Sequence, residues 1–64
     1  MAEGNYVKAD DEGEEFITVY DTFGTTHQTV WYADHGGKGR ARVFAKELAA
    51  EVAAKIGTDW GTNW

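Results

Sequence analysis

The most regular pattern of apolar positions lies in the last third of the chain. Four bulky apolar residues recur there at intervals of four, namely Phe44, Leu48, Val52 and Ile56. A row of alanines runs beside them, namely Ala41, Ala45, Ala49 and Ala53. This spacing is typical of an amphipathic helix, and Gly57 directly afterwards is a natural C-terminal cap. The pattern predicts a helix over residues 45–56, which the small alanine side chains would let sit close to its neighbour.

The start of this helix is ambiguous from sequence. No Ser, Thr, Asp or Asn stands just before it as an N-cap. Residues 40–44 alternate between charged and apolar side chains, which also suits a short strand after a glycine-rich hairpin loop at residues 35–39. In the other interpretation the helix begins near Arg40. We favour the short strand.

Two stronger strands come earlier in the chain. Residues 15–20 and 28–32 are rich in β-branched and aromatic side chains, and Gly24 between them marks a turn. A hairpin centred on this turn sets Ile17 opposite Val30 and Phe16 opposite Trp31. Residues 5–8 are expected to add a third, short strand.

Alternation along these strands separates two faces of a sheet. One face carries Ile17, Val19, Val30 and Tyr32, and the other carries Phe16, Thr18, Tyr20, Thr29 and Trp31. The predicted fold class is α+β, with a small antiparallel sheet of about three strands and one C-terminal amphipathic helix packed on one face. Residues 1–64 are expected to form a single domain, with disorder expected at the ends. The predicted core comprises Ile17, Val19, Val30, Tyr32, Phe44, Leu48, Val52 and Ile56.

Composition restricts the chemistry. The chain has 64 residues and contains no Cys, Pro or Ser. It therefore cannot form a disulfide scaffold, a cysteine-based zinc module, or a site with a Ser or Cys nucleophile. His27 and His35 have no partners at a catalytic or metal-binding spacing. We expect no enzymatic activity, no cofactor and no bound metal. Without a signal peptide or a long apolar run, we expect a cytoplasmic protein that does not enter a membrane.

A single helix can cover only one face of the predicted sheet, yet both faces carry large apolar residues. Three occupants of the second face remain open. The first is the tail, through Trp60 and Trp64. The second is another copy of the chain in a homodimer, and the third is a protein partner. In the third case Phe16, Tyr20 and Trp31 are the candidate anchors, because aromatic residues dominate binding hot spots.

Charge is distributed unevenly along the chain, whose net charge is -5. The cluster at residues 10–15 lacks the spacing of a calcium loop. It reads first as a solvated turn and otherwise as a contact for a basic partner, with Asp10, Asp11 and Glu12 as candidates. We predict a non-enzymatic protein-interaction module, namely a small acidic inhibitor or adaptor of a larger intracellular protein, which could itself handle nucleic acid. A structural subunit of a homo-oligomer is an alternative.

A short basic segment supports a less favoured alternative. Lys38, Arg40 and Arg42 follow a pair of glycines, a composition that suits anion or nucleic-acid binding. The phosphate-binding loop motif and the dinucleotide fingerprint are both absent. The acidic balance of the chain also disfavours broad contact with a phosphate backbone.

Overall fold

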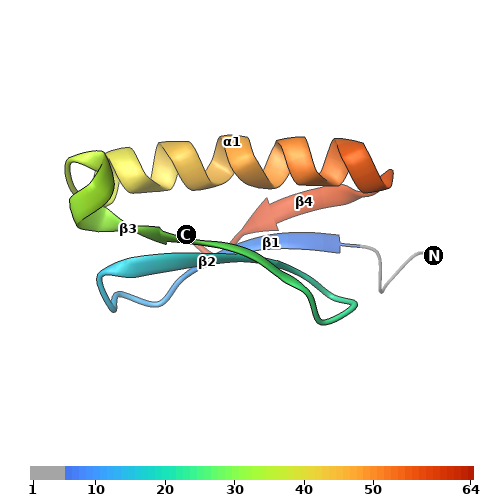
Figure 1. Cartoon of the computed structure of the whole chain (residues 1–64), viewed down its shortest axis with the longest axis horizontal. Coiled ribbons are helices and arrows are strands. Elements are labelled where there is room, and N and C mark those ends of the chain that lie inside the picture. Colours follow the sequence, from blue (N-terminus) through green and yellow to red (C-terminus); the bar gives the residue numbers. More distant parts are fainter. Residues whose placement is uncertain (1–5) are drawn as a thin grey trace.

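The computed structural model describes residues 6–64 and shows one helix lying across one face of a four-stranded sheet (Figure 1). The elements in chain order are β1 (Tyr6–Asp11), β2 (Phe16–Asp21), β3 (Thr26–Trp31), a 3-10 turn η1 (Tyr32–His35), α1 (Lys38–Ile56) and β4 (Asp59–Thr62). The strand order is β3-β2-β1-β4, in which the first three strands are antiparallel and β4 runs parallel to β1. The predicted α+β class, with a small sheet and one helix, is confirmed.

The predicted hairpin register is confirmed. Ile17 lies opposite Val30, and Phe16 lies opposite Trp31. The pairing becomes irregular between Val19 and Tyr20, so that Tyr20 lies opposite Thr26. The register is correct because one face of the hairpin is buried, and a one-residue slip would expose its β-branched side chains.

The number of strands differs from the prediction. The strand expected at residues 5–8 extends to Asp11, while its first expected position, Asn5, lies outside the described residues. The strand β4 was not predicted. It pairs with β1, so that Val7 lies opposite Trp60. Parallel neighbours need a long crossover connection, which α1 supplies, and the four residues of β4 are too few for a clear alternation.

The prediction of a short strand at residues 40–44 is wrong, because α1 begins at Lys38. The alternation in this segment also fits a helix, and three features of the packing favour that form. Ala41 is fully buried, Arg42 reaches a carboxylate of β1, and the Phe44 ring stacks on His35 with centroids 4.4 Å apart. Gly37, which has no side chain to cap the helix, is the N-cap residue.

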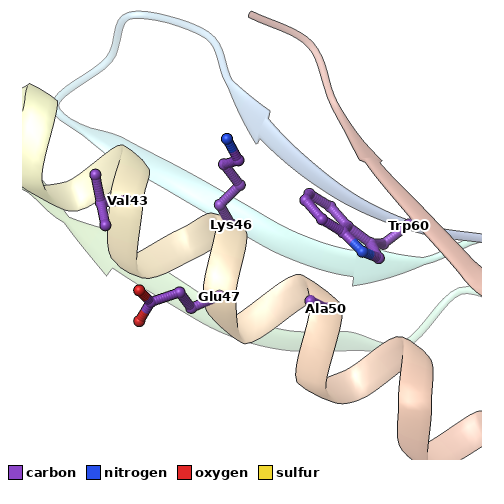
Figure 2. Close-up of a pocket in the computed structure, with 5 residues that line it drawn as sticks. All are labelled: Val43, Lys46, Glu47, Ala50 and Trp60. Carbon is purple, nitrogen blue, oxygen red and sulfur yellow. The ribbon is translucent and has the colours of Figure 1, made fainter.

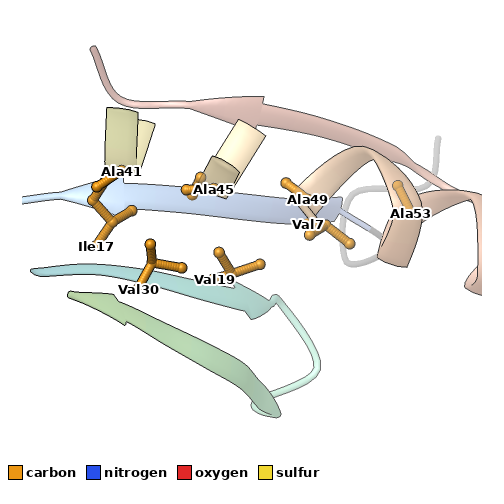
Figure 3. Close-up of a cluster of buried hydrophobic side chains, with 9 residues drawn as sticks. Val7, Ile17, Val19, Val30, Ala41, Ala45, Ala49 and Ala53 are labelled. Carbon is orange, nitrogen blue, oxygen red and sulfur yellow. The ribbon is translucent and has the colours of Figure 1, made fainter. Parts of the chain in front are cut away.

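The alanine row, rather than the bulky apolar stripe, forms the centre of the helix interface. Ala41, Ala45, Ala49 and Ala53 are buried against the sheet (Figure 3). The sheet contributes Val7, Ala9, Ile17, Val19 and Val30. Three predicted core residues of the helix, Phe44, Leu48 and Val52, are only partly buried, as is Tyr32.

Ile56 is 44% exposed, so its assignment to the core is wrong. Small side chains let a helix approach a sheet closely. Larger neighbours are therefore displaced to the sides of the contact.

Candidate functional site

The face of the sheet away from α1 is left uncovered by every described element (Figure 1). Strand alternation places on this open face Tyr6, Lys8, Asp10, Phe16, Thr18, Tyr20, Thr29 and Trp31. The idea that the C-terminal tail covers this face is wrong. Trp60 lies on the side of α1, and Trp64 lies against Arg42 with the guanidinium carbon 5.1 Å from the ring centroid.

The most accessible apolar group on the open face is an aromatic pair formed by Phe16 and Trp31. These residues lie directly opposite each other on β2 and β3, and their ring centroids are 4.9 Å apart at an angle of 53°. Trp31 remains 47% exposed. Tyr20 does not belong to this pair, because it lies four positions further along β2, about 13 Å away in an extended strand.

Carboxylates surround the same end of the open face. We call Asp10, Glu12, Glu14 and Glu15 the acidic rim, since they lie at the end of β1 and in the turn that leads to Phe16. The three glutamates are exposed. The nearby Asp10 carboxylate raises the pKa of Glu12 by repulsion, so negative charge is crowded beside the aromatic pair. The Asn63 side-chain amide donates a hydrogen bond to Asp10.

Asp11 was expected in this acidic surface, but the structure places it inside the molecule. Its side chain faces α1, where it accepts hydrogen bonds from Arg42 Nε at 2.7 Å and from the Tyr32 hydroxyl. The Gly13 backbone N–H donates to it at 3.0 Å. Burial works to raise the pKa of Asp11, but the hydrogen bonds from Tyr32 and Arg42 outweigh it and lower the pKa to about 2. The prediction of a solvated turn is therefore wrong for Asp11, which cannot present its carboxylate to a partner.

The sequence contained one signal of this burial. Asp11 shares the alternation of Val7 and Ala9, which both face the helix. Position on the buried face of a strand thus gave more information than membership of an acidic cluster. A carboxylate at such a position requires a donor, and Arg42 supplies it from α1.

The basic segment does not form one surface. Arg42 is committed to Asp11 and Trp64. Lys38 and Arg40 are exposed at the start of α1, and the Arg40 side chain lies close to Gly36. The three basic residues that were proposed to bind an anion therefore divide into one structural group and two surface groups.

A carboxylate–imidazole pair that the sequence analysis missed lies at the β2–β3 turn. His27 Nε2 is 2.8 Å from Asp21 Oδ2. Asp21 Oδ1 also accepts the backbone N–H groups of Phe23 and Thr25, at 2.9 and 3.1 Å. Burial alone would raise the pKa of Asp21. The hydrogen bonds from the turn amides and His27 outweigh this effect, so the pKa lies below its ordinary value. Because turn donors occupy this carboxylate, the pair closes the hairpin.

A second surface feature lies between α1 and β4. A hollow of about 290 Å³ is lined by Val43, Lys46, Glu47, Ala50 and Trp60 (Figure 2). Within residues 6–64, no three His, Asp or Glu side chains come together as a metal site would require. Over the same residues, no helix has the length and apolar character needed to cross a membrane. A scan against models of protein families, a search of curated proteins and a search of solved structures each found no match to this chain.

Proposed function

We propose that this chain is a non-enzymatic protein-binding domain that uses the aromatic pair and the acidic rim together. The observation that carries the proposal is the exposure of Trp31, which stands in contact with Phe16 on a face that no described element covers. Tryptophan is strongly enriched among residues that dominate binding energy. Its neighbour Phe16 adds apolar area and limits the motion of the indole ring.

The acidic rim selects the chemistry of the partner. Asp10 and Glu12 repel each other beside the aromatic pair, and a cationic side chain between them would relieve this repulsion. Arg and Lys also bind favourably over aromatic rings. The partner segment is therefore basic and partly apolar, and opposite charge would speed its association. A domain of this kind acts as an inhibitor or adaptor of a basic protein, including proteins that themselves bind nucleic acid.

A defined peptide tests this proposal. An isotope-labelled sample is titrated with a short peptide of alternating Arg and Leu, while amide and indole N–H resonances are followed by NMR. We expect the largest shifts at Trp31, Phe16 and Glu12, and weaker binding as salt concentration rises. Shifts centred on Lys38 and Arg40 during titration with a single-stranded oligonucleotide would instead support nucleic-acid binding and overturn the proposal.

Two variants separate the apolar and charged contributions. Trp31→Ala is expected to weaken peptide binding by at least about thirtyfold, as a hot-spot residue does. The matched control is Phe23→Ala, because Phe23 is 67% exposed in the β2–β3 turn and lies outside the proposed surface. The double variant Asp10→Asn with Glu12→Gln is expected to flatten the salt dependence. Equal effects of Trp31→Ala and Phe23→Ala would contradict the proposed surface.

A further inference from the structure

The two edges of the sheet differ in their capacity to pair with another strand. At the β3 edge, the irregularity between Val19 and Tyr20 disturbs the pairing, and such irregularities discourage a further strand. At the β4 edge, the Asn63 N–H donates to the Ala9 carbonyl at 3.3 Å, towards β1. Since backbone groups alternate along a strand, Trp60 and Thr62 direct theirs outward. No strand within residues 6–64 pairs with this outer edge.

Apolar surface accompanies this free edge on the side of α1. Trp60 projects from β4 beside the hollow, which Val43 borders from the helix (Figure 2). Val43 is 58% exposed and Trp60 is 37% exposed. A strand added to β4 would bring its own side chains over this hollow, because neighbouring strands lie about 4.8 Å apart.

On the other side of the sheet, the same edge combines a glycine with two opposite charges. Gly61 lies opposite Lys8, and Asp59 lies opposite Tyr6. The Tyr6 side chain extends over Gly61, where an added Cβ atom would collide with its hydroxyl oxygen. Lys8 Nζ lies 5.7 Å from the centroid of the Tyr6 ring. Lys8 forms no ion pair with any carboxylate in residues 6–64.

We propose that β4 pairs antiparallel with β4 of a second copy of this chain, about a twofold axis at Trp60. The outward backbone groups of the two Trp60 residues then bond to each other, and both indole rings lie between the two helices. The same register sets Asp59 of one copy opposite Gly61 of the other. Lys8 follows at the next strand, about 10 Å away between Cα atoms, a separation that its long side chain can cover alongside the Tyr6 ring.

Three features favour a second copy over an unrelated strand. A second copy supplies the Trp60 ring for the hollow, the free backbone edge of β4, and Asp59 as an ion-pair partner for Lys8. The twofold symmetry makes each of these contacts occur twice. The resulting sheet has eight strands with both helices on one side. The aromatic pair stays accessible at its outer ends, so this dimer is independent of the protein-binding function proposed above.

Sedimentation equilibrium over a range of concentrations tests the dimer. The unmodified chain is expected to show a monomer–dimer equilibrium. Lys8→Glu creates two repulsive contacts and is expected to raise the dissociation constant by about tenfold. Combining Lys8→Glu with Asp59→Lys is expected to restore most of the affinity. Lys55→Glu is the control, since Lys55 is an exposed helical lysine that does not line the hollow beside Trp60.

Amide exchange locates the contact without any substitution. In the dimer, the Trp60 N–H is expected to exchange more slowly as protein concentration rises, and the Phe23 N–H in the distant hairpin turn is expected to stay unchanged. A chain that remains monomeric at its highest soluble concentration would overturn the proposal. A dimer whose Trp60 amide gains no protection, or that the charge reversal does not weaken, would overturn it as well.

Discussion

Asp11 and Asp21 occupy equivalent places in the sheet but bind different kinds of partner. Each is the last residue of its strand and is buried on the side of α1. Because β1 and β2 are antiparallel, the two carboxylates lie at opposite ends of the molecule. Within the described residues 6–64, the Asp21 carboxylate binds groups no more than six residues away, namely Phe23, Thr25 and His27.

The partners of Asp11 come from distant parts of the chain. Its carboxylate binds Tyr32 of η1 and Arg42 of α1, and its backbone N–H donates to Asn63 Oδ1 at 2.8 Å. Four segments therefore meet at one residue. A local carboxylate closes a turn that its own sequence already favours, whereas a long-range carboxylate makes the helix, the 3-10 turn and the tail depend on one another.

The largest expected effect is the loss of the long-range carboxylate. Asp11→Ala leaves the partly buried Arg42 guanidinium without its carboxylate, and breaking a buried ion pair costs about 3–5 kcal/mol. Domains are stable by only about 5–15 kcal/mol, so much of the stability would disappear. Urea unfolding measures the change. A loss no greater than that from Asp21→Ala would contradict the distinction between the two sites.

Acid should act on the same site. The pKa of Asp11 is about 2 in the folded chain, against an ordinary value of 3.8. A carboxylate whose pKa is lowered by folding contributes its full stabilisation at pH values above its ordinary pKa. This contribution is lost as the pH falls towards 2. The loss amounts to about 2 kcal/mol. Asp11→Asn is expected to flatten the dependence of unfolding free energy on pH, while Glu51→Gln, at an exposed helical position, should leave it unchanged.

The local carboxylate should matter less. Asp21→Ala removes the acceptor for two turn amides and for His27, and we expect the melting temperature to fall by roughly 4–8 °C. The helix and tail should keep their polar contacts, because within residues 6–64 no hydrogen bond or ion pair joins the Asp21 side chain to either of them. Amide exchange therefore separates the two variants: Asp21→Ala should speed exchange in the β2–β3 turn alone. Faster exchange throughout α1 would show that this site is also long-range.

The same difference between local and long-range contacts decides how much of the fold could be predicted from sequence. The β2–β3 hairpin was predicted in register because its signals are local: β-branched residues, one buried face and a glycine turn. The early part of α1 and the whole of β4 were not predicted, because contacts with distant parts of the chain determine their structure. Arg42 belongs to a helix once it reaches Asp11, and β4 forms against β1, which lies about fifty residues earlier.

The candidate site follows the same rule. Phe16 and Trp31 were placed on one face from the hairpin register alone, and the structure brings their rings together. Asp11 and Arg42 were assigned to surfaces because their charges suggested solvent, but their long-range pairing takes both out of the candidate contacts. The acidic rim that remains, Asp10, Glu12, Glu14 and Glu15, is the part that no distant cation neutralises within residues 6–64.

The smallest expected effect concerns the turns beside the two carboxylates. The turn after Asp11 holds Glu15 at a φ of 76°, a conformation that costs a non-glycine residue about 1–2 kcal/mol. The turn after Asp21 uses Gly24, with a φ of 104° and open space around it. Glu15→Gly is therefore expected to raise the free energy of unfolding by about 0.5–1 kcal/mol, since glycine's greater freedom in the unfolded chain offsets part of the gain. Gly24→Ala should lower it by a similar amount, and urea unfolding of both variants checks the pair. A Glu15→Gly variant less stable than the unmodified chain would show that the Glu15 side chain stabilises this turn beyond the strain it introduces.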